Sequence, residues 1–316
     1  MAPFLTHLVI GERVWAALVG QVSNLPSGQV TNLSNTRQVS GLPVGQVSNL
    51  PGGQVTNLSN YGTFLFGCLA PDVDKFCDGL EQGTTHFLPK DRQRAPLRRH
   101  TRYFLDHQTD FLRAPFADLT PGEQTFVRGY LCHIATDEVT GRLGRTLQQR
   151  LAAGGAPLPN VDALLTAIDP RLWAKAADPE AVLSALAVAS IPADTWTFAP
   201  HGCLTAMYRI VLPQVQEGGG LEPYLRMVRR HWYWLRHGRV SDAQDDPDLE
   251  ADLTAHRRHV EADLPRAERL LSEIDLGDLV EQAVQHSLQV IEALDGGYHS
   301  RVPGTLRDKY RESNRL

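Results

Sequence analysis

The sequence predicts an all-α fold, a multi-helix bundle, on three observations. Apolar residues recur at helical spacing along most of the chain after residue 61. Helix start signals alternate with Gly- and Pro-rich breaks over the same stretch. Alternating, strand-like patterns are confined to one short repeat. We therefore expect one helical domain over residues 1–297, followed by a basic tail at 298–316.

The chain opens with two apolar, helix-compatible segments, 6–18 and 61–72, which a repeat separates. The repeat, residues 20–60, consists of five related units of eight or nine residues and carries one charged residue, Arg37, in 41 positions. Gly, Asn, Ser and Pro fill most of each unit, which favours turns or disorder. We expect a low-complexity loop inserted between the first two helices. A short β-ladder or an interaction tag is the alternative interpretation.

The helices after the repeat follow from apolar stripes and start signals. The segment 98–114 is amphipathic. A capping box with proline in the first turn is formed by Thr120, Pro121 and Glu123. It predicts the start of a helix that runs to about residue 152. Further helices are expected at 161–168, 179–190, 202–216, 221–237, 247–274 and 276–294.

Composition narrows the class of protein. The formal net charge is −5, and a negatively charged protein repels the phosphate backbone of a nucleic acid. A nucleic acid is therefore not the favoured partner. Four cysteines without a C-x-x-C motif indicate neither a disulfide scaffold nor a cysteine zinc cluster, and we expect reduced thiols. The first residues lack the basic region of a signal peptide, and no apolar stretch is long enough to span a bilayer. These features predict a soluble, cytoplasmic protein without stable membrane insertion.

The strongest local signal for chemistry is the pair His133 and Asp137. The two residues are four apart on an expected helix and therefore project from one face, which Phe126 and Tyr130 continue. An imidazole and a carboxylate that point into a core need a partner, because burying them unpaired is costly. A shared metal ion would be such a partner. A simple hydrogen bond between His133 and Asp137 is the other explanation.

Three more short motifs place acids and histidines in apolar surroundings. Thr6-His7 lies in the first apolar helix, and Pro71-Asp72 follows the apolar run that ends the second. Thr84-Thr85-His86-Phe87 places His86 in an apolar-flanked loop. Taken singly, the three are explained as a core histidine, a helix-ending turn and a satisfied loop histidine.

Taken in order, the motifs TH, PD, THF and GYLCH-x-x-x-D resemble the zinc-dependent phospholipase C family of bacteria, and most closely its non-secreted branch. The resemblance covers about residues 1–140, interrupted by the repeat. It implies an all-α bundle of the phospholipase C and single-strand nuclease type, with its metal site among the helices.

The resemblance implies metal ligands at His7, Asp72, His86, His133 and Asp137. A carboxylate in the position of Asp72 typically bridges two metals or positions the attacking water, so Asp72 is the expected catalytic residue. Nitrogen and oxygen ligands suit Zn²⁺, which activates water and polarises phosphoryl oxygens. The expected function is hydrolysis of a small phosphate ester or a phospholipid. A non-enzymatic helical protein with a structural metal site is the alternative.

The sequence departs from the family in the second half of the ligand set. Glu138 and the residues after it stand where the family carries a further histidine. The only later counterpart of the family's His-x-x-x-Glu pair is His259-x-x-x-Asp263, and His256 and His286 are equally good candidates. The ligand set therefore supports one or two zinc ions, and a third ion would need some of these residues.

Overall fold

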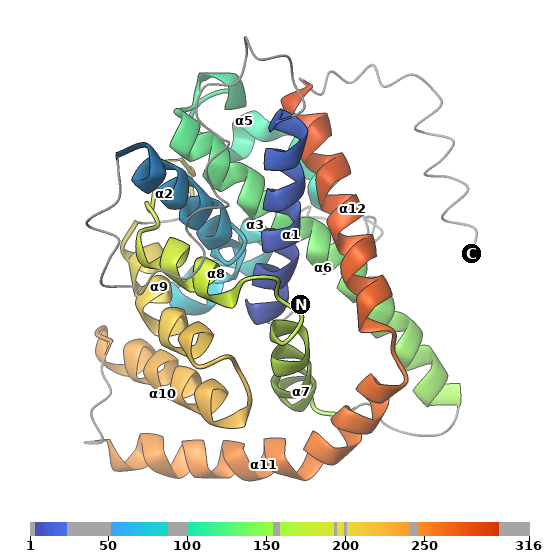
Figure 1. Ribbon diagram of the computed structural model, residues 1–316. Helices are drawn as coiled ribbons and strands as arrows, with labels where there is room; N and C mark the ends of the chain where they lie inside the picture. Colours follow the sequence, from blue (N-terminus) through green and yellow to red (C-terminus); the bar gives the residue numbers. More distant parts are fainter. Residues whose placement is uncertain are drawn as a thin grey trace.

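The long helix α6, Pro121–Ala153, runs through the middle of the bundle in the computed structural model and packs against α1, α2, α4 and α12 (Figure 1). The structure describes residues 4–23, 52–87, 100–153, 159–192, 195–198, 201–240 and 246–296. Besides α6, its helices are α1 Phe4–Ser23, α2 Gly52–Gly67, η3 Ala70–Phe76, α3 Gln82–Thr85, α4 His100–Asp106, α5 Gln108–Phe111, η4 Phe116–Asp118, α7 Val161–Trp173, α8 Pro179–Ala187, α9 His201–Gln216, α10 Leu221–His237, α11 Pro247–Ser272 and α12 Leu276–Asp295.

The all-α fold class is confirmed. Within the described residues, extended pairing is limited to one isolated bridge between Leu112 and Trp196. The capping box that starts α6 is present, because the N–H of Thr120 donates to Glu123 and the N–H of Glu123 donates back to the Thr120 hydroxyl. No described helix is both long enough and apolar enough to cross a membrane.

The segment 98–114, expected to be one helix, is divided in two within the part described. The break between α4 and α5 falls at His107, whose ring bonds the carbonyl oxygen of Tyr103. Phe104 and Phe111, on either side of the break, both pack against the ring of Phe87. The apolar side chains of this segment therefore do face the core, as the sequence predicted. The break in the helix was not predictable, because it accompanies an aromatic cluster around Phe87 that forms only in the folded protein.

The end of the repeat differs from the expected loop. Residues 52–60 form the first part of α2, and Asn57 and Leu58 are buried there. The prediction of a loop over residues 20–60 is therefore wrong at both ends, because α1 continues through residues 20–23 and α2 contains residues 52–60. In the last unit, packing of Leu58 into the core outweighs the weak local preference for a helix. Residues 24–51 lie outside the described residues. The interpretations of the repeat as a β-ladder or an interaction tag concern these residues and stay predictions.

α2 and α6 cross at two glycines. A Cβ atom on Gly129 would lie 2.0 Å from the carbonyl oxygen of Phe64, and one on Gly67 would lie 2.4 Å from that of Phe126. Only glycine permits such a close approach of two backbones. The contact brings the end of α2, and the chain that follows it, against the middle of α6.

A disulfide joins Cys77, which follows η3, to Cys203 in α9. The prediction of reduced thiols is therefore wrong for this pair, while Cys68 and Cys132 are free and buried. The two bonded cysteines are 126 residues apart, so only the fold could reveal them as neighbours. The cytoplasmic location stays a prediction, and the disulfide counts against it because such bonds are rare in reducing compartments.

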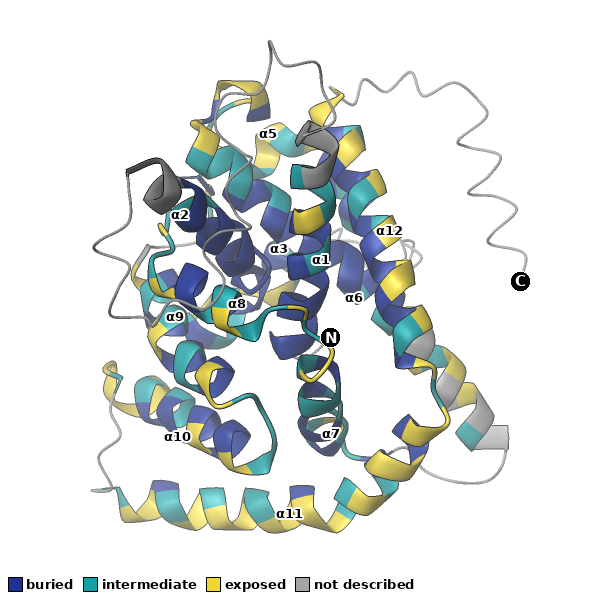
Figure 2. Ribbon diagram, viewed as in Figure 1, coloured by how far each residue is buried: buried dark blue, intermediate teal, exposed yellow. Residues whose placement is uncertain are grey.

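Burial follows the layering of the helices (Figure 2). α6 as far as Val139 and the lower part of α1 lie inside the bundle, whereas α11 exposes much of its surface along one side. α7 packs against both α1 and α11 and therefore links the inner and outer helices. The first turns of α1 are buried for this reason, and they carry His7.

Candidate metal centre

The structure brings together the five residues that the resemblance singled out as ligands. His7 lies on α1, Asp72 on η3 and His86 directly after α3, while His133 and Asp137 lie on α6. Their ligand atoms form two overlapping groups, each within 4.8 Å, one of His7, His133 and Asp137 and one of Asp72, His86 and His133. The three histidines and Asp72 are at most 2% exposed.

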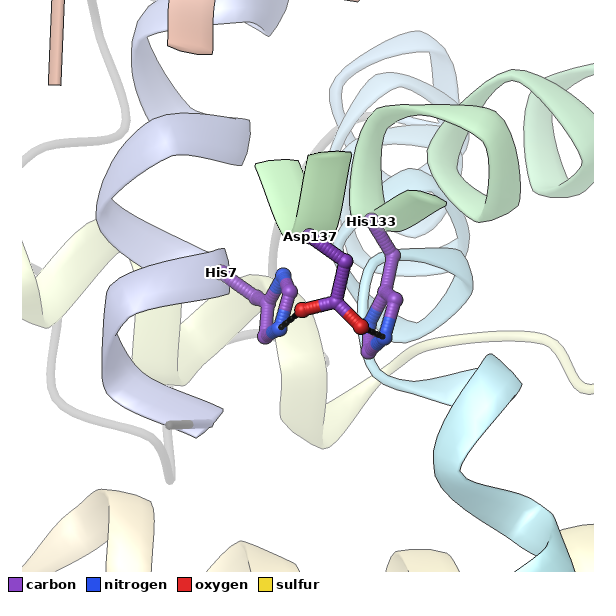
Figure 3. A group of neighbouring side chains, drawn as sticks. All are labelled: His7, His133 and Asp137. Atoms are coloured by element: carbon purple, nitrogen blue, oxygen red, sulfur yellow. Dashed lines mark ion pairs between the residues drawn. The ribbon is translucent and has the colours of Figure 1, made fainter. Parts of the chain in front are cut away.

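Asp137 lies between the histidines of both groups. Its Oδ1 atom is 3.7 Å from Nε2 of His7. Its Oδ2 atom is 3.6 Å from Nε2 of His86 and 3.7 Å from Nε2 of His133. Figure 3 shows the two carboxylate oxygens of Asp137 directed to the ring edges of His7 and His133. The two rings are themselves stacked, with centroids 3.7 Å apart. Each carboxylate oxygen therefore faces a different part of the cluster.

Hydrogen bonds on the far side of the rings set which nitrogen faces the cluster. Nδ1 of His133 lies 2.8 Å from the carbonyl oxygen of Cys68, so it must carry the proton and donate. Nδ1 of His86 lies 2.9 Å from the hydroxyl of Thr85, which itself donates to the carbonyl of Gln82. In the neutral rings, Nε2 of His86 and Nε2 of His133 therefore present lone pairs to the carboxylates.

The buried surroundings favour neutral histidines and ionised acids. Burial lowers the pKa of His7 well below its usual range and lowers that of His86 to about 4. Burial alone would raise the pKa of Asp72, but Lys75 and the imidazoles lower it. Burial would likewise raise the pKa of Asp137, but His133 and His7 hold it well below its usual range. These are the protonation states that metal binding requires.

The donor set fits a metal ion better than a hydrogen-bonded core. Distances of 3.6–3.8 Å between ring nitrogens and carboxylate oxygens are too long for hydrogen bonds. Tetrahedral zinc ligands at about 2.0–2.1 Å lie about 3.4 Å from one another. Nε2 of His86 and Nε2 of His133 are buried and have no hydrogen-bond partner among the described residues. The spacing and the lone pairs are those of ligands that converge on a shared cation.

The later residues that could have completed the ligand set lie elsewhere. His259 is exposed on α11, and Asp263 accepts a hydrogen bond from the N–H of Asn160. His256 bonds the hydroxyl of Tyr224. Nε2 of His286 lies 2.7 Å from Glu138, so it is paired with an acid outside both groups. The described geometry therefore contains ligand groups built from the first 140 residues alone.

Two residues next to the cluster were not anticipated from the sequence. Nζ of Lys75 lies 2.5 Å from Oδ1 of Asp72, three residues earlier on η3. Glu138 is buried and accepts hydrogen bonds from the N–H of Thr101 and from His286. The three-residue spacing of Asp72 and Lys75 was the available signal, since such pairs meet on a helix. The partners of Glu138 come from α4 and α12 and left no local signal.

A cavity of about 310 Å³ adjoins the cluster. Asp72 and Lys75 line it from η3, and residues of α1, α7, α9, α10 and α11 form its other walls. A volume of this size is in the range of small-ligand sites. The candidate metal centre therefore borders a space in which a small organic molecule fits.

Comparison of the chain with protein-family models, with curated proteins and with solved structures found no match.

Proposed function

We propose that the chain is a zinc-dependent phosphoesterase of the phospholipase C type. The observation that carries the proposal is the approach of the Asp137 carboxylate to three buried imidazoles, two of which have unpartnered Nε2 atoms. Asp72 of the same cluster lines a ligand-sized cavity. A cluster of this composition with access to a cavity suits a hydrolytic metal site, because such a site needs room for water and substrate.

One ion would be held by His86, His133, Asp72 and Oδ2 of Asp137. A second ion would be held in part by His7 and Oδ1 of Asp137. Zinc bound there supplies a Lewis acid that lowers the pKa of water toward about 7 and polarises a phosphoryl oxygen. Asp72 borders the cavity and lies 3.8 Å from Nε2 of His86, which supports the proposal that its carboxylate would orient the attacking water. The resemblance noted from the sequence motifs supports the same roles.

Lys75 would bind the phosphoryl group. Its ammonium borders the cavity and pairs with Asp72 at 2.5 Å. When Asp72 binds a cation, Lys75 loses part of this attraction and becomes available for an anionic phosphoryl oxygen. A positive group aimed at developing charge is worth about 10²-fold or more in rate in comparable sites.

Metal analysis of the purified protein tests the proposal. We expect at least one tightly bound zinc ion per chain, and chelator-sensitive hydrolysis of a chromogenic phosphodiester. His133→Ala removes a member of both ligand groups and should abolish activity together with stoichiometric zinc. His259→Ala, on the exposed face of α11, is the matched control and should change neither. Less than one metal ion per chain, or unchanged metal content in His133→Ala, would disprove the proposal.

A structural metal site in a non-enzymatic protein is the second candidate. Burial of His7, His86 and His133 to at most 2% exposure favours it, because an ion there would tie α1, α3 and α6 together. On this reading, chelation lowers the melting temperature while no hydrolysis of any phosphate ester is lost.

A further inference from the structure

His86 follows a turn in which one buried hydroxyl contacts three polar groups. The hydroxyl belongs to Thr85, the last residue of α3, which is 0% exposed. Its Oγ1 atom lies 2.9 Å from Nδ1 of His86, 3.2 Å from the carbonyl oxygen of Gln82 and 3.4 Å from Oδ1 of Asp74. Thr85 therefore connects the ring of a proposed ligand to α3 and to η3.

The partners of this hydroxyl determine which nitrogen of His86 carries the proton. A threonine hydroxyl has one proton to donate, and the carbonyl oxygen of Gln82 can only accept it. Asp74 adds a carboxylate oxygen as a second acceptor. With its proton directed to these oxygens, the Thr85 hydroxyl accepts from Nδ1 of His86 through a lone pair. Nε2 of His86 then keeps its own lone pair for a metal ion.

A second hydrogen bond connects the same turn to α6. The hydroxyl of Tyr130 donates to the carbonyl oxygen of Thr85 at 2.6 Å, and both residues are buried. Tyr130 precedes His133 by three residues and therefore lies on the same side of α6. Thr85 thus contacts every element of one ligand group. The members of this group are Asp72 on η3, His86 after α3 and His133 on α6.

The backbone directly after His86 has an unfavourable conformation. Phe87 has a φ of 52°, in the left-handed region that residues with a side chain rarely adopt. Its ring is buried and packs against Phe111 and Tyr130. Such a conformation persists only where the surrounding structure imposes it. Contacts of Thr85 on one side and of Phe87 on the other therefore hold His86 in one position.

We propose that Thr85 positions His86 for metal binding, through a hydroxyl that fixes the tautomer and a carbonyl that ties the turn to α6. The assignment rests on the proposed metal-dependent function. Thr85 is not among the described residues that line the cavity, so it acts through His86 and not on the substrate. Outer partners of this kind set the orientation and basicity of a metal-bound imidazole, and their loss weakens metal binding about 10- to 100-fold.

Competition with a chromogenic zinc chelator measures the zinc affinity of the purified protein and its variants. Thr85→Val replaces the hydroxyl by a methyl group of similar size, and zinc should bind about 10- to 100-fold more weakly. Thr85→Ser keeps the hydroxyl and should bind zinc as tightly as the wild-type protein. Tyr130→Phe removes the hydrogen bond to the Thr85 carbonyl and keeps the ring. It is the second variant for the case that Thr85→Val does not fold, and it should weaken zinc binding as well.

Thr63→Val is the matched control. Thr63 is 1% exposed, and its hydroxyl donates to the carbonyl of Ser190 and accepts from the N–H of the same residue. The change removes a buried hydroxyl whose hydrogen bonds involve no proposed ligand. It should lower the urea concentration at the midpoint of unfolding and leave the zinc affinity unchanged. Loss of zinc affinity in Thr63→Val equal to that in Thr85→Val would overturn the assignment.

Long-range proton–nitrogen NMR of the metal-free protein reports the tautomer of His86 directly. Wild type and Thr85→Ser should carry the proton on Nδ1, whereas Thr85→Val should lose this preference because no hydroxyl then faces Nδ1. A general loss of stability in the folded protein would not change the tautomer. A wild-type proton on Nε2, or the same tautomer in wild type and Thr85→Val, would overturn the assignment.

Hydrolysis of a chromogenic phosphodiester is measured on the same preparations. Hydrolysis by wild type together with an unchanged zinc affinity in Thr85→Val rejects the role of Thr85 and leaves the enzyme proposal standing. Zinc binding that depends on the Thr85 hydroxyl, without any hydrolysis, supports the role of Thr85 and rejects the enzyme. A wild-type protein that binds no zinc overturns both.

Discussion

At the scale of single residues, the proposed site depends on which ring nitrogen each histidine presents. The carbonyl of Cys68 fixes the proton of His133 on Nδ1. The hydroxyl of Thr85 likewise faces Nδ1 of His86. The sequence predicted that His133 and Asp137 share a face, because helical spacing determines it. It could not predict the tautomers, because Cys68 is 65 residues away from His133 and meets it only through the crossing of α2 and α6.

Lys75→Met tests the role given to the ammonium beside Asp72. We expect the turnover number for a phosphodiester to fall about 10- to 100-fold while zinc content stays unchanged, because the change removes a phosphoryl partner and keeps every proposed ligand. Steady-state kinetics and metal analysis measure the two quantities. Lys175→Met, at an exposed position, is the control. Unaltered turnover in Lys75→Met would contradict the role.

Asp169→Asn tests a pH dependence that arises from one buried acid. Burial raises the pKa of Asp169 to about 7 from its ordinary value of 3.8. Between these values the folded protein holds a proton that the unfolded chain has released, so this residue's contribution to stability falls as pH rises from about 4 to about 7. An asparagine keeps an acceptor for the N–H of Thr6 and does not ionise.

Urea unfolding of the metal-free protein at pH 5 and pH 7.5 measures the effect. The free energy of unfolding of wild type should fall on going from pH 5 to pH 7.5 by on the order of 2–4 kcal/mol more than that of Asp169→Asn. Asp78→Asn, at an exposed acid, should follow the wild-type curve. Parallel curves for Asp169→Asn and wild type would show that the acid is ionised in the folded protein throughout this range.

At the scale of elements, the site depends on how closely α2 approaches α6. Gly129→Ala would place a Cβ atom 2.0 Å from the carbonyl oxygen of Phe64 and force the helices apart. We expect it to lower the free energy of unfolding by about 1–3 kcal/mol or more. It should also weaken zinc binding, since the same crossing carries the carbonyl of Cys68 to His133.

Gly144→Ala, further along the same helix, is the matched control for that change. No atom lies within 4 Å of its added Cβ atom, so it should stabilise the protein by up to about 1 kcal/mol through helix propensity. Denaturant unfolding and metal titration give both readouts. Equal stabilities of the two variants would mean that the helices can separate without loss.

The short helix η3 illustrates what local pattern cannot predict. Pro71 indicated the end of α2, and the chain does turn there, but it continues as a 3-10 helix that carries both Asp72 and Lys75. α10 holds this segment, because the ring of His231 bonds the carbonyl of Lys75 and the indole of Trp234 donates to that of Phe76. Polar atoms of His231 and Trp234 therefore anchor a segment of the candidate site.

At the scale of the whole molecule, the helical periodicity of the sequence predicted the fold class and the positions of most helices after residue 120. Apolar stripes, capping residues and breaks are local, so they could be read without knowing which helices meet. The cavity, the partners of Glu138 and the disulfide each join segments that are far apart in the chain. They could not be predicted because no local spacing encodes them.

Replacing both Cys77 and Cys203 by serine tests the contribution of the long-range covalent link. The bond closes a loop across 126 residues, so its loss should lower the free energy of unfolding by about 2–5 kcal/mol. Urea unfolding with and without a dithiol reductant measures it. The reductant should destabilise the wild-type protein and leave the double variant unchanged. An unaffected wild-type protein would show that the bond makes no contribution.

The helical end of the repeat has a consequence for how this gene can change length. The octapeptide Gly-Gln-Val-Thr-Asn-Leu-Ser-Asn occurs at 28–35 and again at 53–60, where it forms part of α2. Loss of residues 36–60 by recombination between the two copies would join the first copy directly to Tyr61. The new junction would supply the same eight residues, including the leucine that the core buries. A loss of repeat units between these two copies would therefore leave the eight residues that precede Tyr61 in α2 unchanged.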